Sequence, residues 1–199
     1  MNFIELSAEN ASRETKKLAD IIRQQYTPDA VVFVAKGAYR IGLELGEIFD
    51  VPVLEIFAER KHSALKRFAA PLLQILPRKL KFIMRNMEIK KGTHKNEPDR
   101  NVFWGKIPEE ARDISFKNIL LVDDSCDTGN TFIQCIVEIR KQFPEAEIKT
   151  AAINVFSVSQ WIFNTDFYIY TDHIISGPWS NDSPEHKAFI CGYNEKFGK

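Results

Sequence analysis

Residues 119–131 read ILLVDDSCDTGNT, and this stretch decides the fold. Four apolar residues come first, and two carboxylates, Asp123 and Asp124, follow at once. A short, continuous apolar run of this kind is typical of a strand that is covered on both faces of a sheet. Beyond Gly129 the apolar residues recur at helical spacing. The stretch therefore predicts a buried strand, a loop from Asp123 to Thr131, and a helix.

The same alternation of strands and helices occurs along most of the chain. Helices are expected over residues 7–25 and from about 39 to 49, and further strands over residues 30–35, 51–56, 150–156 and 167–170. Buried strands that alternate with helices of this length indicate a parallel sheet with helices on both faces. The predicted fold class is α/β, a doubly wound and mainly parallel sheet flanked by helices.

A basic segment separates the two halves of this pattern. Residues 60–100 hold 12 Lys or Arg against 3 acidic residues, although Lys+Arg and Asp+Glu balance at 27 each over the whole chain. Leucines at helical spacing near residues 65–76 indicate an amphipathic helix. We expect residues 1–199 to form a single domain, with residues 60–105 as an insertion that acts as a hood or lid.

Composition argues for a protein of the cytoplasm. The three cysteines are too few and too scattered for a disulfide framework or a zinc site. The first residues lack the basic and apolar segments of a secretory signal. No apolar stretch approaches the roughly 20 residues that a membrane span needs. We therefore expect a cytoplasmic protein without a membrane partner.

The residue types between Asp123 and Thr131 suit a phosphorylated sugar. Asp123 and Asp124 are acceptors for sugar hydroxyls, or for waters on Mg²⁺. Gly129 permits a tight turn and a close approach of the backbone to a ligand. The backbone N–H groups from Asp127 to Thr131 open a helix, where unpaired donors and the helix dipole favour a phosphate.

Other readings of the acidic loop compete with this one. The spacing DDSCD also occurs in prenyl-diphosphate enzymes, but those carry it on a helix of an all-helical fold. A metal-dependent phosphohydrolase could use the two carboxylates alone. A purely structural loop is disfavoured, because adjacent carboxylates repel each other unless a ligand compensates them.

Taken whole, residues 119–131 resemble the signature of type I phosphoribosyltransferases. That family uses 5-phosphoribosyl-1-pyrophosphate with Mg²⁺. The resemblance implies that Asp123 and Asp124 hold the ribose hydroxyls and the metal, and that Asp127 is the catalytic base. The remaining loop residues would bind the 5′-phosphate end of the substrate: Ser125, Cys126, Thr128, Gly129, Asn130 and Thr131. Cys126 belongs to this set as a loop residue and is not expected to act as a nucleophile.

A second match lies at Lys36, Gly37 and Ala38, which follow the apolar run AVVFVA. The position is similar to the family's pyrophosphate loop, in its Lys-Gly version. By this resemblance, Lys36 meets the pyrophosphate charge while the backbone donors of Gly37 and Ala38 bind its oxygens.

Residues 167–179, FYIYTDHIISGPW, resemble the base-binding segment of small 6-oxopurine phosphoribosyltransferases. Ile174, with His173 beside it, stands where that family commonly has a stacking aromatic residue, and Phe156 stands where it has a lysine. These positions and Trp179 are the candidate base contacts, and they leave the nucleobase-like acceptor open. Dimers are frequent in the family, so a homodimer is expected.

The alternative function is a regulator of the same fold that senses phosphoribosyl pyrophosphate without transferring its sugar. Such a protein would bind nucleic acid through the basic insertion, because Lys and Arg contact phosphates.

Overall fold

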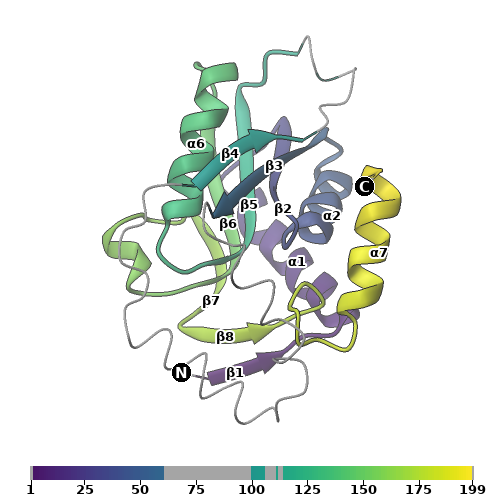
Figure 1. The fold of residues 1–199 in the computed structure, drawn as a ribbon. Helices are drawn as coiled ribbons and strands as arrows, with labels where there is room; N and C mark the ends of the chain where they lie inside the picture. The colour runs from purple at the N-terminus through teal and green to yellow at the C-terminus, as the bar shows by residue number, and fades with distance from the viewer. Residues whose placement is uncertain (1, 61–99, 106–110, 112–113, 199) are drawn as a thin grey trace. The chain divides into compact units, whose positions relative to one another are not determined.

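The structure is a computed structural model that describes residues 2–60, 100–105, 111 and 114–198 (Figure 1). The chain divides into two compact units, Met1–Ala58 with Val102–Lys199 and Glu59–Asn101. The first unit holds the described helices and all strand residues except the end of the strand at 53–60 and the start of the strand at 100–104. The predicted helix near residues 65–76 and the basic surplus of residues 60–100 fall almost entirely outside the described residues, so the insertion stays a prediction.

The centre of the fold is a six-stranded sheet with the strand order β4-β3-β2-β5-β6-β7. Its strands are β2 (Ala30–Ala35), β3 (Val53–Arg60), β4 (Arg100–Trp104), β5 (Asn118–Cys126), β6 (Glu147–Val155) and β7 (Phe167–Thr171). Strand β2 runs parallel to both β3 and β5, and β6 runs parallel to both β5 and β7. The predicted parallel, doubly wound sheet is confirmed.

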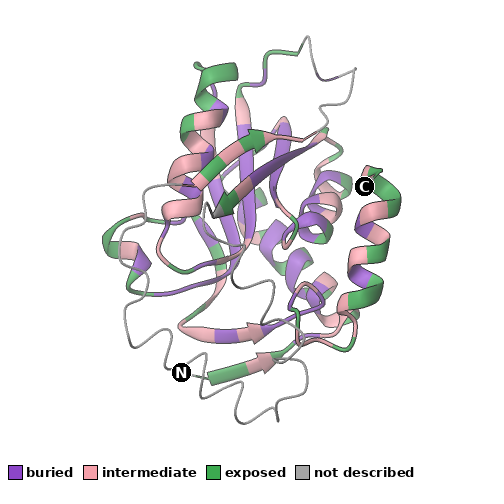
Figure 2. Ribbon diagram, viewed as in Figure 1, coloured by how far each residue is buried: buried purple, intermediate pink, exposed green. Residues whose placement is uncertain are grey.

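Helices cover both faces of this sheet (Figure 2). One face packs against α1 (Ala8–Arg23), α2 (Tyr39–Phe49) and α7 (His186–Phe197), and the other against α6 (Asn130–Gln142). Successive strand residues alternate between the two cores: Phe33 and Leu120 lie in the first, and Val32 and Leu121 in the second. Burial on both faces explains why these strands read as continuous apolar runs.

The structure differs from the sequence predictions in the bounds of several strands and in a second sheet. Strand β5 continues through Cys126, so Asp123 and Asp124 lie within the strand and not in a loop. Strand β3 begins at Val53 rather than at residue 51, because Pro52 has no N–H to donate. A second sheet of two parallel strands, β1 (Asn2–Glu5) and β8 (His173–Ser176), was not predicted. Strand β1 is too short and too polar to stand out as a buried strand.

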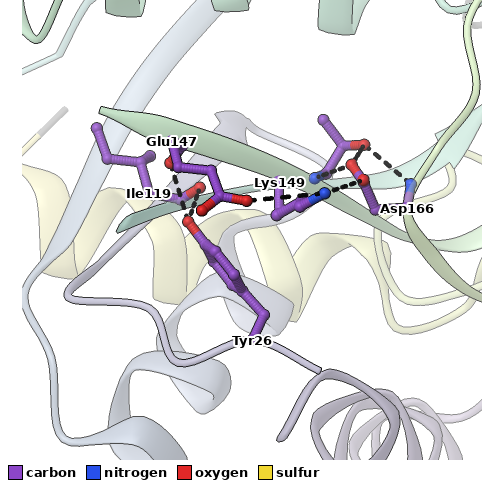
Figure 3. Close-up of polar contacts among 6 residues, drawn as sticks. Tyr26, Ile119, Glu147, Lys149 and Asp166 are labelled. Carbon is purple, nitrogen blue, oxygen red and sulfur yellow. Dashed lines mark hydrogen bonds and ion pairs between the residues drawn. The ribbon is translucent and has the colours of Figure 1, made fainter. Parts of the chain in front are cut away.

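Polar contacts fix the amino ends of the central strands (Figure 3). The buried Tyr26 hydroxyl lies 2.9 Å from the Glu147 carbonyl oxygen and 3.3 Å from that of Ile119. Asp166 accepts hydrogen bonds from the Thr150 amide and hydroxyl, and its other oxygen lies 3.1 Å from Lys149 Nζ. These contacts join β5, β6 and the start of β7 at the edge opposite to the acidic residues of β5. In the described part of the chain, no helix is both long and apolar enough for a membrane span.

Replacing Tyr26 by Phe should lower the free energy of unfolding by about 1 kcal/mol, because the substitution removes the hydroxyl that contacts the Glu147 and Ile119 carbonyl oxygens. Urea denaturation measures the change. Tyr168→Phe is the matched control, since Tyr168 lies exposed on β7 and its loss should cost less than about 0.5 kcal/mol. Equal stability of the two variants would contradict the role given to Tyr26.

Candidate functional site

The two loops singled out in the sequence meet at the carboxyl edge of the sheet. Strands β2 and β5 are parallel neighbours, so the residues that follow them emerge side by side. The Asp124 carboxylate lies against Gly37: a Cβ atom built on Gly37 would stand 2.6 Å from Asp124 Oδ1. Gly37 is therefore needed for this close approach, since any larger residue would displace the carboxylate. Ligands of open parallel sheets bind at this edge.

Three carboxylates lie along the end of β5 and the loop after it. Asp123 is buried, and its Oδ1 accepts a hydrogen bond from the Asp124 amide at 2.9 Å. Asp124 is half-buried, while Asp127 is exposed and accepts a hydrogen bond from the Ser125 hydroxyl at 3.0 Å. The three acceptors thus differ in exposure, and Asp127 is the one most open to a ligand.

The N-terminus of α6 presents backbone donors beside these carboxylates. Gly129 is the N-cap with a φ of 80°, a conformation that favours glycine, and the Phe163 side chain lies where its Cβ would be. The first bond of the helix runs from the Ile133 amide to the Gly129 carbonyl, so the amides of Asn130 and Thr131 have no intrahelical acceptor. The N-cap residue is a glycine and so has no side chain to cap this end. The donors and the helix dipole favour an anion here.

Cys126 is held inside the protein next to this site. Its Sγ lies 3.6 Å from the buried Ser159 hydroxyl, and the Gly129 amide is directed toward the same sulfur. The Gly129 amide is therefore engaged with this sulfur. The amides left to bind an anion are those of the next residues, Asn130 and Thr131. Burial raises the pKa of the Cys126 thiol, although hydrogen bonds from Thr165, Ser159 and the Gly129 amide oppose the shift. A buried, protonated thiol suits the expectation that Cys126 is no nucleophile.

A second helix N-terminus carries Lys36, Gly37 and Ala38. The peptide bond between Ala35 and Lys36 is cis, and Ala38 is the N-cap of α2 without a side-chain hydrogen bond. The Ala38 amide donates to the Val34 carbonyl at 3.2 Å, so it is engaged within the protein. Lys36 is exposed, and its Nζ lies 5.1 Å from the ring centroid of Tyr193. An ammonium group and a helix N-terminus make this a second place for an anion.

The candidate base contacts lie on segments next to the loop after β5. The buried Phe156 donates its amide to the Cys126 carbonyl at 3.0 Å, which places it beside Asp127 in space. The His173 amide donates to Asn154 Oδ1 at 3.2 Å, and its Nδ1 lies 2.7 Å from the Thr171 carbonyl. This contact favours the tautomer with hydrogen on Nδ1.

Ile174 and Trp179 lie farther into the fold. Ile174 is buried in β8 and is paired in register with Phe3 of β1. Trp179 is half-buried and packs against Gly177. It lines a cavity of about 450 Å³ together with Tyr39 of α2 and residues of α1 and α7. Trp179 thus borders the helical core as well as the start of α2.

Sequence reasoning missed two polar residues near this edge. Asn154 is buried in β6, opposite Ser125 of β5, and holds the amide of His173. It is the one amide side chain in the run TAAINVF, which is a usable signal. Tyr193 of α7 contacts Lys36 from far along the chain, and no local pattern marks it.

Comparisons with known proteins agree with the fold. The family model of the phosphoribosyl transferase domain matches residues 6–154. A purine phosphoribosyltransferase from Pyrococcus horikoshii is 20% identical, with a TM-score of 0.57 and coverage of 90% of this chain and 95% of that one. The Helicobacter pylori xanthine-guanine-hypoxanthine phosphoribosyltransferase is 16% identical, with a TM-score of 0.63 and coverage of 94% and 99%.

A hypothetical protein from Neisseria gonorrhoeae with bound ppGpp is 18% identical, with a TM-score of 0.54 and coverage of 96% and 94%. No curated protein matches the chain.

One thiol of the native protein should react rapidly with Ellman's reagent. Cys191 is exposed, whereas Cys126 and Cys135 are buried. The hydrogen bond to Glu195 raises the pKa of Cys191, so its rate should still be climbing above the pH at which an ordinary thiol levels off. All the thiols should react in denaturant, and Cys191→Ser should remove the fast phase. A second fast thiol would show that Cys126 or Cys135 is accessible.

Proposed function

Because the phosphoribosyl transferase family model covers most of the chain, the protein belongs to this family of enzymes, and we propose that it uses 5-phosphoribosyl-1-pyrophosphate. It would transfer the phosphoribosyl group to a ring nitrogen of a nucleobase-like acceptor and release pyrophosphate. The observation that carries the proposal is the contact between Gly37 and Asp124. This contact brings two uncapped helix N-termini to the same edge, with carboxylates between them.

The substrate matches this arrangement group by group. Its 5′-phosphate would bind the amides at the N-terminus of α6, and its pyrophosphate the loop at Lys36. The ribose between them carries two hydroxyls that could donate hydrogen bonds to Asp123 and Asp124. The Thr128 and Thr131 side chains, both half-buried, would donate to the 5′-phosphate.

Mg²⁺ fits the acceptors at the end of β5. In the described ranges of the chain, no group of three or more His, Cys, Asp or Glu side chains could hold a metal ion by itself. Mg²⁺ is usually bound through one or two carboxylates together with substrate phosphates and waters, which is what Asp123 and Asp124 could provide. When bound, the ion would neutralise charge on the pyrophosphate.

In the proposed reaction, the bond from ribose C1 to a pyrophosphate oxygen breaks and a bond from C1 to the ring nitrogen forms. Negative charge grows on the departing pyrophosphate, where the Lys36 ammonium and the Gly37 amide would stabilise it. The ring nitrogen loses its proton, and Asp127 is the exposed carboxylate that would accept it. The Ser125 hydroxyl would orient Asp127.

The test is incubation with Mg²⁺, phosphoribosyl pyrophosphate and a panel of bases, scored for pyrophosphate. Two of the similar solved structures are a purine and a xanthine-guanine-hypoxanthine phosphoribosyltransferase, so hypoxanthine, guanine, xanthine and adenine head the panel, and pyrimidines complete it. Release that depends on one base supports transfer. Binding of phosphoribosyl pyrophosphate without release by any base would favour the regulatory alternative.

That alternative depends on the surplus of Lys and Arg in residues 60–100. It requires RNA or DNA binding that weakens with salt and with neutralisation of basic residues such as Arg78 and Lys79. The homodimer and the cytoplasmic location likewise stay part of the proposal.

Asp127→Asn should bind phosphoribosyl pyrophosphate but lose turnover by about 10²–10⁴, because the amide cannot take the proton. Calorimetry measures binding, and pyrophosphate release measures turnover. Glu138→Gln on α6 is the control: it also removes one negative charge, from a surface pair with Lys141, and should leave turnover unchanged. Undiminished turnover in Asp127→Asn would refute its role as base.

The double variant Asp123→Ala, Asp124→Ala should lose the thermal stabilisation that phosphoribosyl pyrophosphate gives the native protein. A ligand at 100 times its dissociation constant stabilises by about 2.7 kcal/mol, which a thermal melt resolves. Melting without ligand shows whether the variant folds. A folded variant with its full ligand-induced shift would contradict the proposed ribose contacts.

A further inference from the structure

Helix α7 lies outside the residues matched by the family model, yet it reaches the loop assigned to pyrophosphate. The Lys36 ammonium stands over the Tyr193 ring at 5.1 Å from its centroid, close enough for a cation–π contact. Tyr193 is itself fully buried. Its ring is therefore a fixed surface beneath an exposed lysine.

The Tyr193 ring is held at both its hydroxyl and its face. The hydroxyl donates a hydrogen bond to Glu55 Oε1, and Glu55 is a buried carboxyl on β3. The ring packs against Tyr39, with centroids 5.4 Å apart, and against Phe197 at 5.2 Å. A hydrogen bond and two ring contacts leave the side chain little freedom to move.

Helix α7 is held in place by contacts with α2 and with the start of α1. Phe189 packs against Tyr39 in a tilted arrangement with ring centroids 4.5 Å apart, and Gly192 brings the helix within reach of the Tyr39 hydroxyl. Glu185, at the start of α7, accepts a hydrogen bond from the Ala8 amide at 2.7 Å. Tyr39 follows directly after the loop of Lys36, Gly37 and Ala38. Helix α7 thus contacts the residue that directly follows that loop.

We propose that Tyr193, anchored by Glu55, is a positioning residue that places the Lys36 ammonium for pyrophosphate. A free lysine samples many rotamers, and ordering it on binding costs entropy. An aromatic face that restricts Lys36 beforehand lowers that cost. This inference rests on the proposed function, which assigns the Lys36 loop to pyrophosphate.

The test compares the binding of two separate probes, pyrophosphate with Mg²⁺ and ribose 5-phosphate, by calorimetry. Tyr193→Leu removes the ring and should weaken pyrophosphate binding about threefold to tenfold. Ribose 5-phosphate would use the amides of α6, so its affinity should change less than twofold, within roughly 0.4 kcal/mol. Tyr193→Phe keeps the ring and should restore most of the pyrophosphate affinity.

A double-mutant cycle shows whether the effect passes through Lys36. In a Lys36→Met background, Tyr193→Leu should weaken pyrophosphate binding no further. Phe189→Leu is the control for packing, since Phe189 is equally well buried in α7 and touches Tyr39. It should lower the melting temperature without a selective loss of pyrophosphate affinity.

Three results would overturn the inference. They are unchanged or tighter pyrophosphate binding by folded Tyr193→Leu, an equal loss for both probes, and a loss that persists without Lys36. The proposed function fails separately, if the native protein binds neither probe and no base induces pyrophosphate release.

Discussion

The contact of the Asp124 carboxylate with Gly37 is the constraint on which the site depends. It requires two neighbouring parallel strands, β2 and β5, to bring Gly37 and Asp124 side by side, with no side chain on the glycine. Once they do, the two helices that follow point their N-termini to the same edge. Carboxylate acceptors and backbone donors then lie close together at this edge. A sugar with phosphate groups at two positions has the complementary groups, namely hydroxyl donors between anionic acceptors.

The strands that carry the candidate site at their carboxyl ends are held together by contacts at their amino ends. Tyr26 and Asp166 join β5, β6 and β7 where these strands begin, and burial on both faces holds the strands in register. The candidate site residues stand at strand ends and helix starts, where the first amides of a helix, such as those of Asn130 and Thr131, have no acceptor within that helix. The amino edge of the sheet thus carries contacts that stabilise the fold, and the carboxyl edge carries the candidate ligand-binding residues.

Local sequence predicted the parts of the structure whose cause is local. The apolar run ILLV and the glycine after it predicted β5 and the start of α6, and AVVFVA predicted β2 to the residue. The end of β5 was wrong because hydrogen bonding to β6 continues as far as Cys126, and composition does not record that pairing. Strand β1 was missed because its partner, β8, lies at the other end of the chain. The contact of Tyr193 with Lys36 could not be predicted for the same reason, because the two residues lie far apart in the sequence.

The parallel pairing of β1 with β8 has a consequence for biosynthesis. Strand β1 leaves the ribosome long before residues 173–176 exist, so it emerges as an unpaired edge with Phe3 exposed. Strands β2 to β6 can pair during translation, whereas β7 and this small sheet must wait for the last part of the chain. A nascent chain would therefore display β1 as an unpaired segment for most of its synthesis. The complete fold would arise late, after the polypeptide has brought its distant segments together.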